Sequence, residues 1–190
     1  SNSLLFTDII NNKVLSWNEK DGVKDYISPS GNTGYAPNSG EALVGANALN
    51  FDSKGNLILC QMGDRRVSII KNSPTSKPNF ETLIDNYNGK RLNSPNDIII
   101  SKDGFYYFSD PAFGFLNLDT FKFVESDLRE IDFHGIYRFN PINKELSLVT
   151  DKVSVPNGLA LSLDEKFLFI KKMGVLDESP KVLKLNLENK

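Results

Sequence analysis

Three asparagines stand at the same point of a repeating pattern and could together bind a cation or a hydroxylated ligand. Asn47, Asn96 and Asn157 each precede a short apolar run, a polar turn and a second apolar run. The amide oxygen of asparagine is a hard donor of the kind that Ca²⁺ accepts. Neutral oxygens alone hold Ca²⁺ poorly, because affinity rises with the number of carboxylate ligands. The pattern therefore predicts an oxygen-donor site that needs one or two acids from elsewhere.

A structural role for the same asparagines is the alternative. Asparagine often bonds its own backbone ahead of a strand, and a repeat can preserve such a cap in every copy. Asp97 is interpreted in this structural way. Side chains alternate along a strand, so Asp97 should point away from Asn96 and accept a structural hydrogen bond.

The remaining reactive side chains are interpreted as structural, and no catalytic residue is assigned within the chain. His134 is the only histidine, which excludes a histidine-rich metal site, and the sequence has no nucleophile-elbow motif. Cys60 is the only cysteine, which excludes an internal disulfide and suggests a small buried hydrophobe. Arg65 and Arg66 are interpreted as part of a solvated or salt-bridged hairpin and not as an anion-binding site.

The elements that position the asparagines are predicted to be β-hairpins. The asparagines are 49 and 61 residues apart, and each begins one copy of a two-strand pattern. The turns of the first two copies contain glycine, which suits the positive φ of a tight hairpin. A further alternating strand is predicted in each of four places: 13–17, 66–70, 135–139 and 181–185. No stretch has a helical apolar period, so the predicted class is all-β.

Four strands in roughly 40–50 residues form the blade of a β-propeller. By this spacing the chain contains about four blades of one incomplete propeller domain spanning residues 1–190. Residues 111–133 lengthen the third blade and are predicted to form a surface loop. Residues 106–108 are expected to pack between blades rather than to form a stacking platform. A sandwich of regular hairpins is the main structural alternative.

The composition limits the classes of partner. The chain is 39% hydrophobic and 24% charged, which is typical of a folded globular protein. Its net charge is −2 and no basic stripe is present, so we expect no nucleic-acid partner. The apolar runs are too short to predict a membrane span. The sequence does not distinguish a cytoplasmic protein from a periplasmic or secreted one.

Ser94-Pro95-Asn96-Asp97 and Val155-Pro156-Asn157-Gly158 are the most informative pieces of an ordered set of motifs. The set resembles the senescence-marker-protein, gluconolactonase and drug-responsive-lactonase family. Other matching pieces occur in the family's order at 5–9, 45–49, 63–67, 107–111 and 135–138. The match spans essentially the whole chain. The piece around Asn157 is also similar to strictosidine-synthase-like propellers.

This resemblance implies a six-bladed propeller that holds one divalent metal at the mouth of its channel and hydrolyses lactones. The metal is expected to be calcium, with zinc, manganese or magnesium as alternatives. Asn157 would be a metal ligand, Asn96 would contact the metal or the substrate, and Asn47 would line the substrate wall. The cation would polarise the lactone carbonyl and acidify a water, and a carboxylate would accept the proton.

The family's remaining acids do not match positions of this chain. One is a glutamate of a Glu-Gly-Pro piece expected before Ser1, and the other is an aspartate expected beyond Lys190. The chain also begins within a predicted strand and without methionine, so we expect a fragment or a processed product. Alone, it should be unstable or associate, because open blades expose strand edges, and it should lack lactonase activity.

Two departures from the family pattern keep another function open. Gln61-Met62-Gly63 stands where many relatives have a histidine before the glycine. Lys171-Lys172 stands where sister repeats have Thr7-Asp8 and Ser109-Asp110, and this reverses the local charge. The fourth blade is therefore expected to be irregular or the site altered. A non-catalytic propeller that binds a ligand or a protein is the alternative, with strictosidine-synthase-like chemistry more distant.

Overall fold

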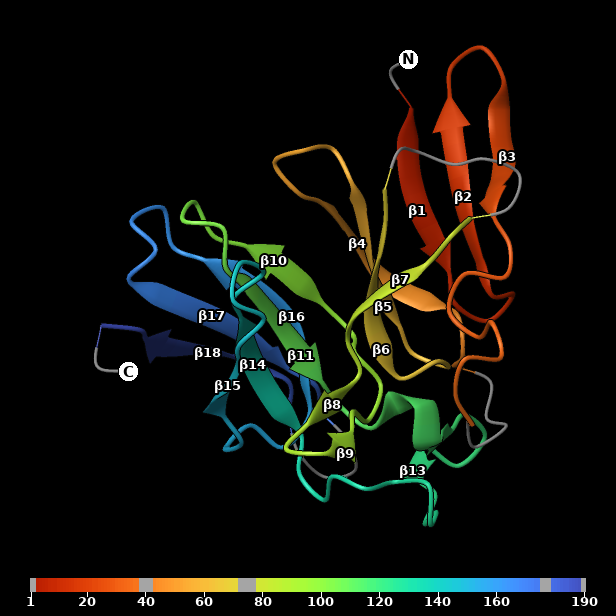
Figure 1. Ribbon diagram of the computed structural model, residues 1–190. Helices are drawn as coiled ribbons and strands as arrows, with labels where there is room; N and C mark the ends of the chain where they lie inside the picture. The colour runs from red at the N-terminus through yellow and green to blue at the C-terminus, as the bar shows by residue number, and fades with distance from the viewer. Residues whose placement is uncertain (1–2, 38–42, 72–77, 175–178, 189–190) are drawn as a thin grey trace.

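The computed structural model describes residues 3–37, 43–71, 78–174 and 179–188. Within them, four antiparallel sheets follow one another along the chain, and each sheet is a meander of adjacent strands. Figure 1 shows the four sheets spread like a fan, with the first (red) and the fourth (blue) at opposite sides. We number these sheets as blades I to IV. The all-β class and the four predicted blades are confirmed.

The strands agree closely with the predicted hairpins. Blade I contains β1 (Leu4–Asp8), β2 (Lys13–Asn18) and β3 (Gly22–Ile27). Blade II contains β4 (Ala46–Phe51), β5 (Leu57–Gln61), β6 (Arg66–Ile70) and β7 (Glu81–Ile84). Blade III contains β10 (Ile98–Ile100), β11 (Tyr106–Asp110), β14 (Gly135–Phe139) and β15 (Leu146–Thr150). Blade IV contains β16 (Pro156–Leu161), β17 (Phe167–Lys172) and β18 (Lys181–Asn186).

Short elements lie in the connections. A two-stranded hairpin of β8 (Asn86–Tyr87) and β9 (Lys90–Arg91) precedes blade III. Between β11 and β14 lie the 3₁₀ turn η1 (Phe113–Phe115), β12 (Leu116–Asn117) and β13 (Lys122–Phe123). No described helix is long and apolar enough to cross a bilayer.

The strands of each blade lie side by side in chain order, so they can be numbered from first to fourth. In blade II this order is β4-β5-β6-β7, and in blade III it is β10-β11-β14-β15. β1 contacts β4 of the next blade in the way that β11 contacts β16. β1 therefore corresponds to the second strand of a blade, and β4, β10 and β16 are first strands.

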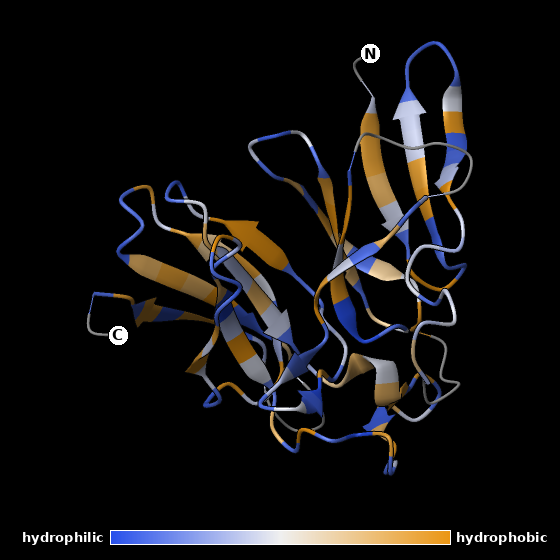
Figure 2. Cartoon of the chain, viewed as in Figure 1, coloured by the Kyte–Doolittle hydropathy of each residue, from blue (hydrophilic) through white to orange (hydrophobic). Residues whose placement is uncertain are grey.

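The hydrophobic core is divided among the boundaries between blades. Leu57 and Leu59 of β5 pack toward blade I, whereas Ile58 and Cys60 pack toward blade III. In Figure 2 the hydrophobic residues (orange) concentrate along the strands, and the hairpin loops are largely hydrophilic (blue). This alternation follows from the two-residue period of a strand that is covered on both faces.

The predicted packing between blades is confirmed at the second strand of blade III. Tyr106 and Phe108 contribute to the core between blades II and III, and Tyr107 contributes to the core between blades III and IV. Cys60 is fully buried, as expected of a small hydrophobe, and burial raises the pKa of its thiol.

Candidate functional site

The three asparagines occupy equivalent backbone irregularities in blades II, III and IV. In β4 the register shifts between Ala46 and Leu49, so that one extra residue lies opposite β5. In β16 the same shift occurs between Pro156 and Leu159. Such β-bulges redirect side chains and often lie beside functional sites.

Blade III has the corresponding pattern just before β10. The Asn96 N–H donates to the Ser109 carbonyl at 2.9 Å, and the Ser109 N–H donates to the Asp97 carbonyl at 3.0 Å. Two consecutive residues of the first strand thus lie opposite one residue of the second. The bulges place Asn47, Asn96 and Asn157 at the same end of their blades.

The surroundings of the three asparagines differ. Asn96 is 3% exposed, whereas Asn47 and Asn157 are partly exposed. The Asn47 Nδ2 lies 3.4 Å from the Met62 sulfur. Among the described residues, the side chains of Asn96 and Asn157 make no hydrogen bond. The metal and substrate roles given to these asparagines remain predictions.

Asp97 accepts hydrogen bonds from backbone groups of two blades. Its Oδ1 accepts the N–H of Ile98 at 2.9 Å, and its Oδ2 accepts the N–H of Leu159 at 2.6 Å. Burial raises the pKa of its carboxyl, and these two donors partly offset that effect. The structural interpretation of Asp97 agrees with these contacts.

Ser109 links the same two blades and was missed by the sequence reasoning. Its hydroxyl donates to the Asn157 carbonyl at 2.7 Å and lies 3.2 Å from the donating N–H of Asp97. The available signal was the contrast with Cys60, which occupies the equivalent position of β5.

Equivalent positions from three blades gather in one apolar cluster beside the asparagines. Ile9, Met62 and Met173 each follow directly after the second strand of a blade. Met62 packs with Phe113, Leu116 and Val155, and Ile9 and Met173 border the same cluster. We call this group of side chains the mouth cluster. Its composition shows that the loops after the second strands converge at one end of the molecule.

Residues 111–133 form a surface loop only in part, because residues 117–130 are partly or fully exposed and the apolar start of the segment is buried. Phe113 and Phe115 of η1 are 6% and 1% exposed, and Leu116 is 6% exposed. In Figure 1 this green segment leaves blade III and lies below β5 and β6. Phe113 and Leu116 pack against residues from the loops of other blades, and this gain of apolar burial explains why the start of the segment is not exposed.

Ser94 and Asp110 anchor the insertion beside Asn96. The Ser94 hydroxyl accepts the N–H of Gly114 at 2.9 Å and donates to the Pro111 carbonyl. The Asp110 carboxylate accepts the N–H groups of Asn93 and Ser94 at 2.8 and 2.7 Å. Burial nevertheless raises the pKa of Asp110 to about 7. The loop that carries Asn96 and the start of the insertion are therefore one bonded unit.

His134 closes the other end of the insertion. Its Nδ1 accepts the N–H of Ala112 at 3.1 Å, and its ring packs against Phe123. Burial lowers the pKa of its imidazole to about 4, with a further contribution from Arg129. A neutral ring that accepts a backbone hydrogen bond is consistent with the predicted structural role.

Arg65 and Arg66 are buried, which corrects the expectation of a solvated pair. They are 2% and 4% exposed. Arg66 Nη2 lies 3.3 Å from the Asp64 carboxylate, so the salt-bridged alternative is the one observed. Arg65 donates through Nε to the Leu92 carbonyl at 2.7 Å, and its guanidinium lies over the Phe115 ring. Arg65 thus ties blade II to the loop that leads to Asn96.

Lys171 and Lys172 do not disturb blade IV. β17 pairs with β18 without a register shift through Lys172, which is opposite Lys181. The bulge of β16 opposite Lys171 has its counterpart in blade II, so the strand pairing of blade IV is not irregular. The other alternative, an altered site at these lysines, stays a prediction.

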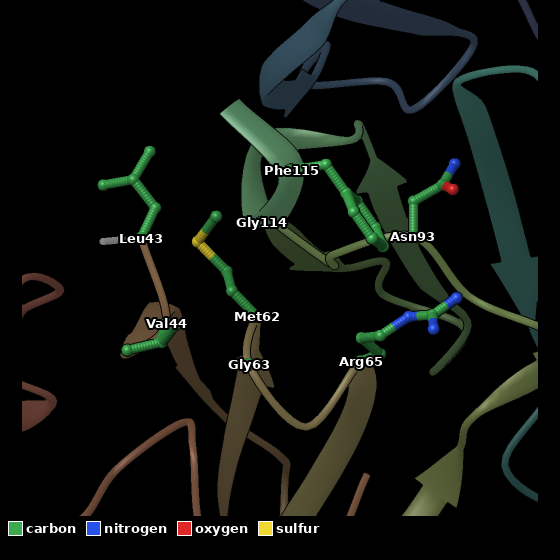
Figure 3. Close-up of a pocket in the computed structure, with 8 residues that line it drawn as sticks. All are labelled: Leu43, Val44, Met62, Gly63, Arg65, Asn93, Gly114 and Phe115. Carbon is green, nitrogen blue, oxygen red and sulfur yellow. The ribbon is translucent and has the colours of Figure 1, made fainter. Parts of the chain in front are cut away.

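The pocket in Figure 3 lies between the mouth cluster and the Arg65 loop. It is too narrow to hold a water molecule, so it is a packing gap and not a substrate site. Its lining residues are Leu43, Val44, Met62, Gly63, Arg65, Asn93, Gly114 and Phe115.

The donors present fit part of a cation site. Asn96 is almost completely buried, and its amide oxygen has the hardness that Ca²⁺ prefers. Among the described residues there is no group of three or more histidine, cysteine or acidic side chains suited to a metal. The neutral asparagines fit as a partial donor set that needs charged ligands in addition.

Comparison with known proteins gives consistent results. A family model described as the SMP-30/gluconolactonase/LRE-like region matches residues 1–178. A gluconolactonase from Zymomonas mobilis is 37% identical over 169 residues, which cover 89% of this chain and 45% of that protein.

Solved structures extend the comparison to the fold. A gluconolactonase from Xanthomonas campestris is 26% identical with a TM-score of 0.74, over 97% of this chain and 54% of that one. A virginiamycin B lyase from Staphylococcus aureus is 16% identical with a TM-score of 0.53, over 97% of this chain and 52% of that one, and shows the fold alone. The chain spans about half the length of these relatives.

Proposed function

Because the chain belongs to the SMP-30/gluconolactonase/LRE-like family, we propose that the complete protein hydrolyses a lactone with a divalent cation at the mouth of the propeller. The gluconolactonase relatives support lactone hydrolysis at the level of the family. Calcium is the first choice of cation, because the donors that this chain offers are oxygens.

The observation that carries the proposal is the repeated bulge at Asn47, Asn96 and Asn157. One capping asparagine needs no functional explanation, because capping is a common role. Here the same residue type recurs in three blades at the same end, beside backbone bulges of the same kind. Three amide oxygens that converge in this way support a shared ligand better than three independent caps do.

Each asparagine has a distinct proposed role. Asn157 and Asn96 would hold the cation through their amide oxygens, and Asn96 would also contact the substrate. Asn47 would orient the lactone through its amide. When bound, the cation supplies Lewis acidity that polarises an ester carbonyl and acidifies water. The mouth cluster contacts Asn47 through Met62, at 3.4 Å from the Asn47 Nδ2.

No general base is assigned among the described residues. Asp97 accepts the N–H groups of Ile98 and Leu159, one at each carboxylate oxygen, and these contacts fit a structural role. We therefore assign no proton transfer to Asp97.

The test is hydrolysis of gluconolactone by the complete protein with Ca²⁺, Zn²⁺ or Mn²⁺ added after metal removal. We expect cation-dependent turnover, and we expect Asn157→Ala to lose cation binding and turnover together, because one change removes a donor common to both. Asn143→Ala serves as the control, because Asn143 lies in an exposed turn between β14 and β15. Full activity after thorough metal removal would contradict the proposal.

A non-catalytic binding propeller is the second candidate. It is favoured by Met62, which is 1% exposed, packs in the mouth cluster and contacts Asn47 where many relatives have a histidine. The measurement that separates the two candidates is turnover under conditions in which cation binding is demonstrated. Bound cation with no hydrolysis of any lactone tested would favour the binding protein.

A further inference from the structure

A polar contact joins blades III and IV directly beneath Asn96 and Asn157. Asp97 accepts the Leu159 N–H at 2.6 Å, and Ser109 donates to the Asn157 carbonyl at 2.7 Å. A hydrogen bond between Ser109 and the Asp97 N–H connects the two contacts. One bonded unit thus reaches from the residue after Asn96 to both sides of the bulge at Asn157.

At the preceding boundary, the described residues in the two equivalent positions form no such polar unit. The position of Asp97 is occupied in blade II by Ala48, and the position of Ser109 is occupied by Cys60. Both residues belong to the apolar packing between blades II and III. The repeat therefore joins two blades satisfactorily with apolar side chains at these two positions.

The polar pair is costly to bury, which argues against a purely structural role. The Ser109 side chain is fully buried, and Asp97 is half-buried. Buried polar groups add little to the free energy of unfolding even when they are hydrogen-bonded. Replacing a buried polar pair with apolar side chains of similar size often leaves that free energy unchanged or increases it. What the polar pair adds is direction, because a hydrogen bond fixes distance and angle where an apolar contact does not.

We propose that Asp97 and Ser109 are positioning residues that fix the Asn157 bulge relative to Asn96 and so set the distance between two donors of the site. The inference rests on the proposed cation role of Asn96 and Asn157. Groups that orient the ligands of a metal typically change its affinity about 10- to 100-fold when they are removed.

The experiment is calorimetric titration of the cation-free complete protein with CaCl₂. The first variant, Ser109→Ala, removes both hydrogen bonds of the hydroxyl. The second variant combines Asp97→Ala with Ser109→Cys and so installs the residues that blade II already uses. We expect both to bind Ca²⁺ at least about 10-fold more weakly than the wild type. Asp97→Asn retains one acceptor, and we expect a smaller loss.

Two control variants separate positioning from general damage. Ser109→Thr preserves the hydroxyl, and threonine already occupies the equivalent position of β1, at Thr7. This variant should therefore retain the wild-type affinity for Ca²⁺. Ser68→Ala removes a buried hydroxyl that has no hydrogen-bond partner, so it reports the effect of losing a buried serine alone. The melting temperature without cation is measured for every variant, and titrations are made well below it.

The outcomes distinguish this inference from the proposed function. If Asn157→Ala loses Ca²⁺ while Ser109→Ala and the double variant bind it within about two-fold of the wild type, the positioning role is wrong and the proposed site stands. If Asn157→Ala binds Ca²⁺ normally, the proposed site fails, and the positioning role fails with it.

Discussion

Asp110 and His134 delimit the insertion of blade III and have pKa shifts of opposite sign. Burial raises the pKa of Asp110 from 3.8 to about 7 and lowers that of His134 from 6.5 to about 4. In both cases the folded protein favours the neutral form, because the charged form loses its hydration. Both groups also bond to the backbone that they neighbour, Asp110 to Asn93 and Ser94, and His134 to Ala112.

Asp110 should make the complete protein less stable as the pH rises. The folded state binds the proton more tightly than the unfolded state, so this stabilisation is full below pH 3.8 and is lost as the pH rises through about 7. In Asp110→Asn the side chain is neutral at every pH. Between pH 3.8 and about 7 the unfolding free energy of this variant should therefore increase relative to that of the wild type by up to about 4 kcal/mol. Urea unfolding at several pH values measures this difference, and a constant difference would contradict it.

His134 should act in the opposite direction. Its folded pKa lies below its unfolded pKa, so its contribution is present above pH 6.5 and is lost as the pH falls through about 4. His134→Asn retains a neutral acceptor for the Ala112 N–H. As the pH falls from 6.5 to about 4, its unfolding free energy should decrease less than that of the wild type, by up to about 3 kcal/mol. The same unfolding series applies, and a variant as acid-sensitive as the wild type would show that His134 titrates normally.

At the residue scale, the sequence identified residues that recur in the repeat but did not reveal the hydrogen bonds between blades. Asn47, Asn96 and Asn157 were found because equivalent positions of a repeat share one type. The Ser109 contact with Asn157 could not be found in this way, because the two residues belong to different blades and their approach depends on how those blades pack. The same holds for the burial of Arg65, whose partner is a carbonyl of the next blade's loop.

At the element scale, the insertion is the part that departs from the repeat. Strands were predicted well because alternation of apolar residues is a local signal. The insertion lacks a period, so the sequence did not distinguish Phe113, which is buried, from Phe121, which is exposed. The burial of Phe113 depends on Met62 and Val155, which lie outside the insertion. Tertiary packing therefore decides the conformation of this segment.

Phe113→Ala should loosen the mouth without unfolding the blades. The side chain is 6% exposed in the mouth cluster, and its removal leaves a cavity that should cost about 3 kcal/mol or more. Hydrogen exchange should become faster in the insertion and in the loop after β1, which contributes Ile9 to the same cluster. Phe121→Ala is the matched control, because Phe121 is 65% exposed and its loss should leave exchange unchanged. Equal effects of the two variants would refute this account of the insertion.

At the scale of the whole molecule, the outer blades present unpaired strands. Among the described residues, β1 pairs only with β2, and β18 pairs only with β17. Leu4 of β1 is 62% exposed and Val182 of β18 is 71% exposed. Exposed edges with apolar side chains favour pairing with another chain.

A polypeptide limited to residues 1–190 should therefore self-associate. We expect light scattering after gel filtration to give a mass above that of one chain, increasing with protein concentration. Lysine in place of Val182 should reduce the association, because charged residues on an edge oppose strand pairing. A monodisperse monomer that unfolds cooperatively would show that the open edges are tolerated.

The two-sided strands at the blade boundaries have a consequence for the history of the repeat. Tyr107 of β11 faces blade IV and Phe108 faces blade II, so a mutation at either position alters the fit to one neighbour only. Duplicated blades could thus diverge one boundary at a time while the opposite boundary kept its ancestral fit. The contrast between Cys60 and Ser109 is of this kind: one blade has an apolar residue at this position of the boundary, and the next has a polar one.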